Sequence, residues 1–204
     1  MNLKNNPELL PLVEWWEKDG KQTLALLVVA AVAVGGWYGW KSHQESVRQA
    51  AAESLVSSHK VEELEESVSR FSGHAQEGIL RIRLAKSYYD EGRYQEALDQ
   101  YEALSANPPD GFADVPAVGK AQCLEAMKRF DEAAAAFDAF AEANTNSFLL
   151  LTAQLGAARS YAQAGDEKKA LARLDALKSA KKGDEFAVAR IEATESSVRR
   201  LGKK

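Results

Sequence analysis

The hydrophobic and polar positions divide the chain into two regions of different character. Residues 22–40 carry no formal charge, and residues 24–34 are almost entirely Leu, Val and Ala. From residue 41 onward, apolar positions recur every three to four residues, the period of an amphipathic helix, and the alternation of a β-strand does not occur. The pattern predicts an all-α protein with one apolar helix followed by a domain of packed amphipathic helices.

The first region has the length and the flanks of a transmembrane helix. A helix over 22–40 spans roughly 28 Å at about 1.5 Å per residue, close to the thickness of the hydrocarbon core of a bilayer. All four tryptophans lie at its two ends, and indole rings favour the lipid headgroup region. We therefore predict contact with the lipid bilayer through residues 22–40 and interfacial anchoring by five aromatic residues, Trp15, Trp16, Trp37, Tyr38 and Trp40.

A cleaved signal peptide is the main alternative for this region. The segment 1–21 argues against it, because that segment is mixed in charge rather than short and basic. The apolar run also ends in Trp-Tyr-Gly-Trp instead of a small-residue cleavage site. Charge does not orient the helix, because the basic residues on its two sides are equal in number. The glycines at 35, 36 and 39 form a helix-packing face or are incidental, and both readings stay open.

A unit of about 36 residues repeats three times in the second region. Ala97, Ala133 and Ala170 occupy equivalent positions, 36 and 37 residues apart. Small residues lie twelve positions before each alanine, and larger apolar residues lie four and seven positions after it. This unit resembles the tetratricopeptide repeat, a pair of helices of about 34 residues. The remaining equivalent positions are Ala85, Ala121 and Ala158; Tyr88, Leu124 and Tyr161; Tyr101, Phe137 and Leu174; Leu104, Phe140 and Leu177; and the turn residues Gly92, Lys128 and Gly165.

These patterns predict an N-terminal transmembrane helix followed by an α-solenoid of tetratricopeptide-like helix pairs. A solenoid also needs terminal elements with polar outer faces, and the amphipathic segments on either side of the repeats fit that role. The predicted order is a tail over 1–21, the transmembrane helix over 22–40, a degenerate helix pair over 41–77, three repeat units over 78–183, and a capping helix with a basic tail over 184–204.

Composition and missing motifs narrow the classes of function. The net charge of −4, from 26 basic and 30 acidic residues, gives no reason to expect nucleic acid as a partner. The three histidines have no Cys or Glu at ligand spacing, and the sequence contains no phosphate-binding loop or nucleophile elbow. The one cysteine, Cys123, has no partner for an intramolecular disulfide. We therefore expect no catalytic activity, cofactor, metal or small-molecule substrate.

The sequence around the apolar run adds a more specific hypothesis. Residues 16–21 read Trp-Glu-Lys-Asp-Gly-Lys and residues 36–40 read Gly-Trp-Tyr-Gly-Trp, with the repeat units following. This arrangement resembles the YfgM family of bacterial inner-membrane proteins. The resemblance implies a single pass with a cytoplasmic N-terminal tail and a periplasmic repeat domain. It also implies an ancillary role at the SecYEG translocon, where secreted chains are handed to periplasmic chaperones.

Two classes of protein-binding function follow. An enzyme subunit or regulator is a third class, which would require a fused or bound catalytic partner. The first is a scaffold or holdase at the Sec translocon that receives secretory chains. The second is a tetratricopeptide scaffold of another envelope complex, for outer-membrane assembly, division or pilus formation. In either case, we expect partner proteins to bind a groove lined by the first helices of the units, with contacts from Lys86, Tyr89, Gln122, Glu125 and Arg159.

Overall fold

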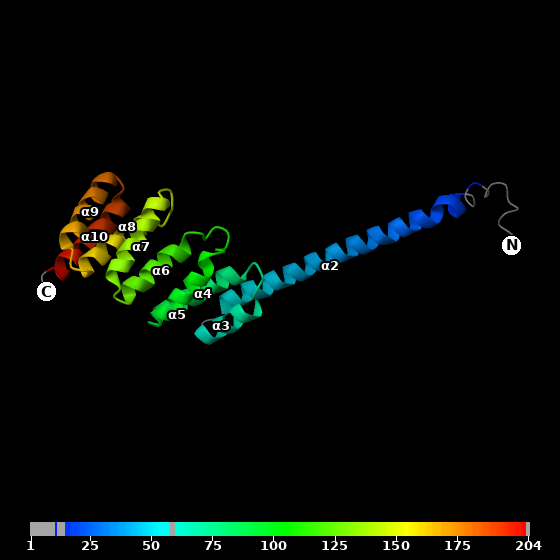
Figure 1. Ribbon diagram of the computed structural model, residues 1–204, viewed down its shortest axis with the longest axis horizontal. Coiled ribbons are helices and arrows are strands. Elements are labelled where there is room, and N and C mark those ends of the chain that lie inside the picture. The colour runs from blue at the N-terminus through cyan, green and yellow to red at the C-terminus, as the bar shows by residue number, and fades with distance from the viewer. Residues whose placement is uncertain (1–10, 12–14, 58–59, 203–204) are drawn as a thin grey trace. The chain divides into compact units, whose positions relative to one another are not determined.

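The protein is all-helical in the computed structural model, which describes residue 11, residues 15–57 and residues 60–202. No strand occurs in those described ranges, so the all-α prediction is confirmed. The chain forms two compact units, Met1–Ala50 and Ala51–Lys204. Figure 1 shows the elements of both units along the chain.

The first unit is dominated by one long apolar helix. A short π-helical segment, η2 (Trp16–Gly20), leads into α2 (Lys21–Ser57). The stretch 22–40 that the sequence predicted to span a membrane lies within α2, which continues without a break to Ser57. Its apolar side chains face outward, and Leu26 and Val32 are each 70% exposed. Among the described residues, this is the one helix long and apolar enough to cross a membrane.

The second unit is a stack of antiparallel helix pairs. Each helix packs on the next one along the chain from α3 to α10, as expected for a repeat array. The repeat register predicted from the sequence matches the three central pairs. The helices are α3 (Val61–Arg70), α4 (Glu77–Asp90), α5 (Tyr94–Ser105), α6 (Val115–Ala126), α7 (Phe130–Ala143), α8 (Leu150–Gln163), α9 (Glu167–Ala180) and α10 (Glu185–Leu201).

Small residues at repeated positions let the helices of the stack approach closely. Ala97, Ala133 and Ala170 are all 0% exposed, which confirms the prediction that they are buried. Two glycines at equivalent positions of α6 and α8, not predicted from the sequence, have the same role. A Cβ on Gly119 would lie 2.6 Å from the ring of Tyr101, and a Cβ on Gly156 would lie 2.6 Å from the ring of Phe137. The absence of a side chain on each glycine therefore leaves room for the aromatic ring of the preceding unit, Tyr101 against Gly119 and Phe137 against Gly156.

The turn between the two helices of each unit uses the left-handed backbone region. Gly92 and Gly165 have φ values of 78° and 98°, and Lys128 occupies the same region in the middle unit with φ of 64°. Left-handed backbone ends a helix tightly, and it favours glycine because a Cβ is disfavoured there. Lys128 is therefore a strained substitute at a position that the repeat assigns to glycine.

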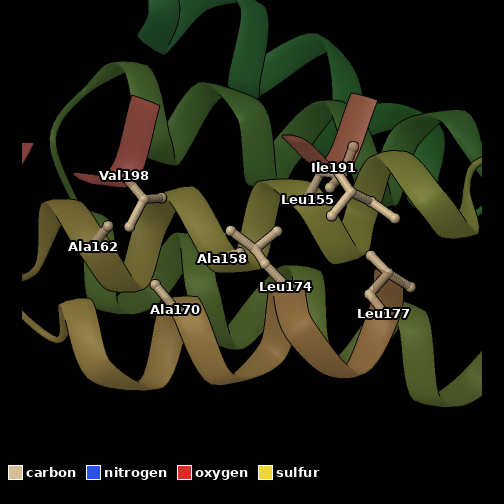
Figure 2. Close-up of a cluster of buried hydrophobic side chains, with 8 residues drawn as sticks. All are labelled: Leu155, Ala158, Ala162, Ala170, Leu174, Leu177, Ile191 and Val198. Atoms are coloured by element: carbon tan, nitrogen blue, oxygen red, sulfur yellow. The ribbon is translucent and has the colours of Figure 1, made fainter. Parts of the chain in front are cut away.

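The last helix covers the open end of the stack. Ile191 and Val198 of α10 are 0% exposed and pack against apolar residues of α8 and α9. Figure 2 shows this cluster, in which the side chains of the three helices point toward one another. Arg199 and Arg200 lie exposed at the other side of the same helix. The amphipathic pattern of α10 thus supplies the polar outer face that a terminal repeat needs.

Candidate protein-binding surface

The first helices of the repeat units form one continuous layer. Helix α6 contacts both α4 and α8, and α8 contacts α10. Within the described residues, the backbones of the second helices α5, α7 and α9 do not approach one another in this way. Because the first helices lie closer together than the second helices, the stack curves toward the first helices, which line its concave side. The inner surface is defined here as the solvent-facing side chains of α4, α6 and α8.

Three of the five residues predicted for the groove lie close together on this inner surface, one from each helix. Arg159 of α8 donates two hydrogen bonds to the carboxylate of Glu125 on α6, from Nε at 3.0 Å and from Nη2 at 2.8 Å. Burial raises the pKa of Tyr89 on α4, and the charge of Glu125 raises that pKa further. The phenol of Tyr89 therefore lies near the ion pair that Glu125 and Arg159 form between the two following units, because the charge of Glu125 shifts its pKa.

The ion pair on the inner surface is partly shielded from water. The side chain of Glu125 is 13% exposed and that of Arg159 is 36% exposed. A two-pronged contact between a guanidinium and a carboxylate holds both groups in a fixed orientation. The site thus presents a phenol and an oriented charge pair, an arrangement suited to recognising polar backbone or side-chain groups of a bound chain.

The other two predicted groove residues lie one helical turn from this cluster. Gln122 precedes Glu125 by three residues on α6 and is half-buried, so its amide is accessible beside the ion pair. Lys86 precedes Tyr89 by three residues on α4, and its ammonium group bonds both carboxylate oxygens of Asp90 at 2.9 and 2.8 Å. Lys86 is mostly exposed and belongs to the rim of the inner surface.

Sequence reasoning missed a contact that fixes successive units to each other. The carboxylate of Asp138 on α7 accepts a hydrogen bond from the hydroxyl of Tyr161 at 2.6 Å and is also paired with the guanidinium of Arg173. The hydroxyl of Tyr88 donates in the same way to Glu65 on α3. In both units an acidic residue lies 23 positions before a tyrosine, and that repeated spacing was the signal available in the sequence.

The aromatic residues predicted to lie at a membrane interface are exposed at both ends of the apolar stretch. Trp15 and Trp16 are each 46% exposed, and Trp37 and Trp40 are 56% and 60% exposed. Tyr38 is 65% exposed, and its ring lies 5.6 Å from that of Trp37. The two groups are separated along the helix by roughly 30 Å at the usual helical rise, which matches a bilayer core.

The described residues contain one cysteine and no metal-binding cluster. No group of three or more His, Cys, Asp or Glu residues in the described ranges is arranged to hold a metal ion. Cys123 is fully buried, and burial raises the pKa of its thiol to about 12. A thiol with such a pKa stays protonated and is a poor nucleophile at neutral pH.

Comparisons with known proteins agree with the repeat architecture. Residues 81–110 match the tetratricopeptide repeat family, a stretch from within α4 to the loop after α5. No curated protein matches the chain. The repeat fold is similar to the crystal structure of nearly identical TPR-like repeats from a putative kinesin light chain of Podosopora anserina. The identity is 18% and the TM-score 0.59, over 80% of this chain and 86% of that chain.

A second crystal structure, of a point-substituted form of the same Podosopora anserina protein, gives a TM-score of 0.54. It is also 18% identical and covers 80% of this chain and 89% of that one. At this level of identity the likeness establishes the fold alone. The class of protein is therefore a tetratricopeptide-like helical repeat protein, and such repeat domains typically bind other proteins and are not catalytic.

Proposed function

We propose that this protein is a membrane-anchored scaffold that binds other proteins on the inner surface of its repeat domain. The observation that supports this most directly is the contact of Arg159 with Glu125, with Tyr89 on the preceding unit close by. These groups come from three successive first helices, so they lie along the path that an extended or helical partner segment would follow. The exposed apolar side chains of α2 support the anchor.

The more specific proposal is a scaffold or holdase at the Sec translocon of a bacterial inner membrane. The N-terminal tail would be cytoplasmic and the repeat domain periplasmic, and the domain would pass secretory chains to periplasmic chaperones. The support for it is the resemblance of residues 16–21 and 36–40 to the YfgM family. A scaffold of another envelope assembly complex is the alternative, and it requires the same fold and the same anchor.

Site-specific crosslinking tests the inner surface as the binding site. A photoreactive amino acid is placed at Gln122 of the full-length membrane protein, and a matched control carries it at Ala139, which is exposed on the second helix α7. We expect crosslinks to secretory chains from position 122 and few from position 139. Equal crosslinking at both positions would contradict the inner surface as the site. Crosslinks from position 122 to a different envelope complex alone would favour the alternative.

Anchor replacement separates translocon contact from client binding. Exchanging residues 22–40 for an unrelated transmembrane helix should reduce copurification with SecYEG, because only this segment reaches the depth of the bilayer. Client crosslinks from position 122 should remain. If copurification is unchanged, the contact with the translocon is made by another part of the chain.

Protease accessibility tests the orientation. In spheroplasts, externally added protease should degrade the repeat domain and leave the N-terminal tail intact. Survival of the repeat domain, under conditions in which a periplasmic control protein is cleaved, would show the opposite orientation. A mature chain that begins after Trp40 would show that the segment is a signal peptide.

A further inference from the structure

Exposed phenylalanines occur at three consecutive junctions between helix pairs. Phe112 lies just before α6, Phe148 just before α8, and Phe186 in the first turn of α10. Their side chains are 40%, 72% and 73% exposed. A single exposed apolar residue is ordinary on a protein surface. Recurrence at these three consecutive junctions, 36 and 38 residues apart, is not explained by the packing of the stack, because these rings are not part of its core.

The three junctions lie on the same edge of the repeat domain. Helices α6, α8 and α10 are neighbours that run in the same direction, and each begins at this edge, as Figure 1 shows for the three connecting loops. Packed helices lie about 8–10 Å apart. The edge therefore presents an aromatic ring roughly every 10 Å, which is about three residues of an extended chain at 3.3 Å per residue. This row of Phe112, Phe148 and Phe186 is called the phenylalanine edge below.

A polar pocket lies between the first two junctions of the phenylalanine edge. It has a volume of about 330 Å³ and is lined by Asp114 from the first junction and by residues 143–147 from the second. The carboxylate of Asp114 makes no hydrogen bond or ion pair with the described residues. Asp166 and Asp184, which also begin helices, each accept a hydrogen bond from a backbone N–H three residues later at 3.0 Å. The negative charge of Asp114 is thus available to a ligand.

Charge distinguishes the occupants of the phenylalanine edge. Residues 106–114 and 143–150, at the first two junctions, contain Asp110 and Asp114 and no basic residue. Residues 181–186, at the third junction, carry two lysines and two carboxylates, and the guanidinium of Arg190 lies 5.9 Å from the ring of Phe186. The negative charge of the edge is therefore concentrated at its first two junctions. The acidic part of the edge, around Phe112 and Phe148, is repelled by an anionic lipid surface, so the aromatic exposure there does not fit a bilayer. It fits a protein segment that combines apolar side chains with a positive charge.

We propose that the phenylalanine edge is a second docking surface, which binds an extended, basic-apolar segment of a partner protein. Three apolar side chains of that segment, spaced three residues apart, contact Phe112, Phe148 and Phe186. A Lys or Arg between the first two enters the pocket and pairs with Asp114. The edge is separate from the inner surface of α4, α6 and α8, so it does not depend on the function proposed there.

A defined peptide tests this proposal on the full-length protein in detergent micelles. The probe is a fluorescent peptide with the sequence Leu-Lys-Ser-Leu-Ser-Ser-Leu, and the control peptide has Glu in place of Lys. Binding is measured by fluorescence anisotropy. We expect the Lys peptide to bind about tenfold more tightly than the Glu peptide, and Phe148→Ser to weaken binding of both peptides about tenfold.

Two further variants isolate the two parts of the edge. Asp114→Asn should remove most of the preference for Lys over Glu while leaving the contribution of the rings. Leu201→Ser is the matched control, because Leu201 is also exposed, at 40%, but lies at the opposite end of α10 from Phe186. It should leave binding unchanged. Circular dichroism checks that each variant keeps its helix content.

Several results would overturn the proposal. These are no binding of the Lys peptide, equal binding of both peptides, or equal loss from Phe148→Ser and Leu201→Ser. Binding of neutral lipid vesicles that depends on Phe148 would show a lipid surface instead. Concentration-dependent dimers that Phe148→Ser abolishes would show that the edge binds a second copy of this chain.

Discussion

Substitution of Gly156 by alanine is the sharpest test of how the repeat units pack. Gly156 lies in the middle of α8, directly against Phe137 of the preceding unit. A Cβ at this position would lie 2.6, 2.7 and 2.8 Å from three carbons of the ring. Carbon atoms in favourable contact are separated by about 3.5–4.0 Å. The Phe137 ring is 0% exposed, so it cannot swing into solvent to make room.

Two effects of opposite sign decide the outcome of Gly156→Ala. Alanine in a helix interior is more favourable than glycine by about 1 kcal/mol, so an unhindered site would gain stability. Overpacking a well-filled core costs about 1–3 kcal/mol. Because the ring is enclosed, we expect the steric cost to exceed the gain, with a net loss of about 1 kcal/mol. For a domain of this size, that loss lowers the Tm by about 2–4 °C.

Thermal unfolding of the full-length protein in detergent, followed by circular dichroism, measures this loss. The matched control is Gly36→Ala in α2, where a Cβ meets nothing within 4 Å. It should leave the unfolding of the repeat domain unchanged. In a Phe137→Leu background the steric cost should disappear, so that Gly156→Ala becomes neutral or stabilising. A stabilising effect in the wild-type background, or an equal cost in the Leu background, would refute this account of the close approach.

Four other substitutions or measurements follow from the same structure. Ala133→Leu should lower the stability of the repeat domain by about 1–3 kcal/mol, because Ala133 is 0% exposed at a helix crossing; an unchanged Tm would contradict the repeat register. Lys128→Gly should raise stability by about 0.5–1 kcal/mol in denaturant unfolding, because it removes a side chain from left-handed backbone. Cys123 should resist a thiol reagent at pH 8 until the domain unfolds, since burial raises the pKa of its thiol to about 12; rapid labelling of the folded protein would show an accessible cysteine. Hydrogen bonds from a backbone N–H and from Arg81 lower the pKa of Glu77. The contribution of Glu77 to stability is therefore present above the ordinary carboxyl pKa and is lost as the pH falls through the lowered pKa. Glu77→Gln should flatten the acid side of a plot of unfolding free energy against pH.

Much of the repeat domain could be predicted because its pattern is local and periodic. Ala97, Ala133 and Ala170 were identified by spacing alone, and all are fully buried. The turn position occupied by Lys128 was also identified by alignment with Gly92 and Gly165. Each unit contacts mainly its neighbours, so a repeated position has the same surroundings in every unit. When the same type of residue recurs at one position of the repeat, its burial in the packed structure can therefore be predicted from the sequence.

The candidate sites were only partly accessible to the same reasoning. Placing Glu125 and Arg159 on the inner surface follows from helical spacing, but the hydrogen bonds between them depend on the distance between α6 and α8. The pairing of Asp138 with Tyr161 and Arg173 was missed for the same reason, because it joins three helices. The phenylalanine edge was also not predicted, since Phe112 and Phe148 lie in loops of varying length and Phe186 lies in the first turn of α10, so their register shifts from unit to unit.

The sequence by itself determined the all-α class, the apolar helix and the register of the repeats, because these depend on periodicity within one helix pair. Tertiary structure alone decided how far α2 extends, which glycines contact aromatic rings, and which charges meet across the inner surface. The contacts of the glycines and the pairing of the charges depend on the distances between helices of different units. Those distances are set by the volumes of the side chains that the two facing helices place between them. A linear pattern specifies which face of a helix is buried, but not which atoms it meets there.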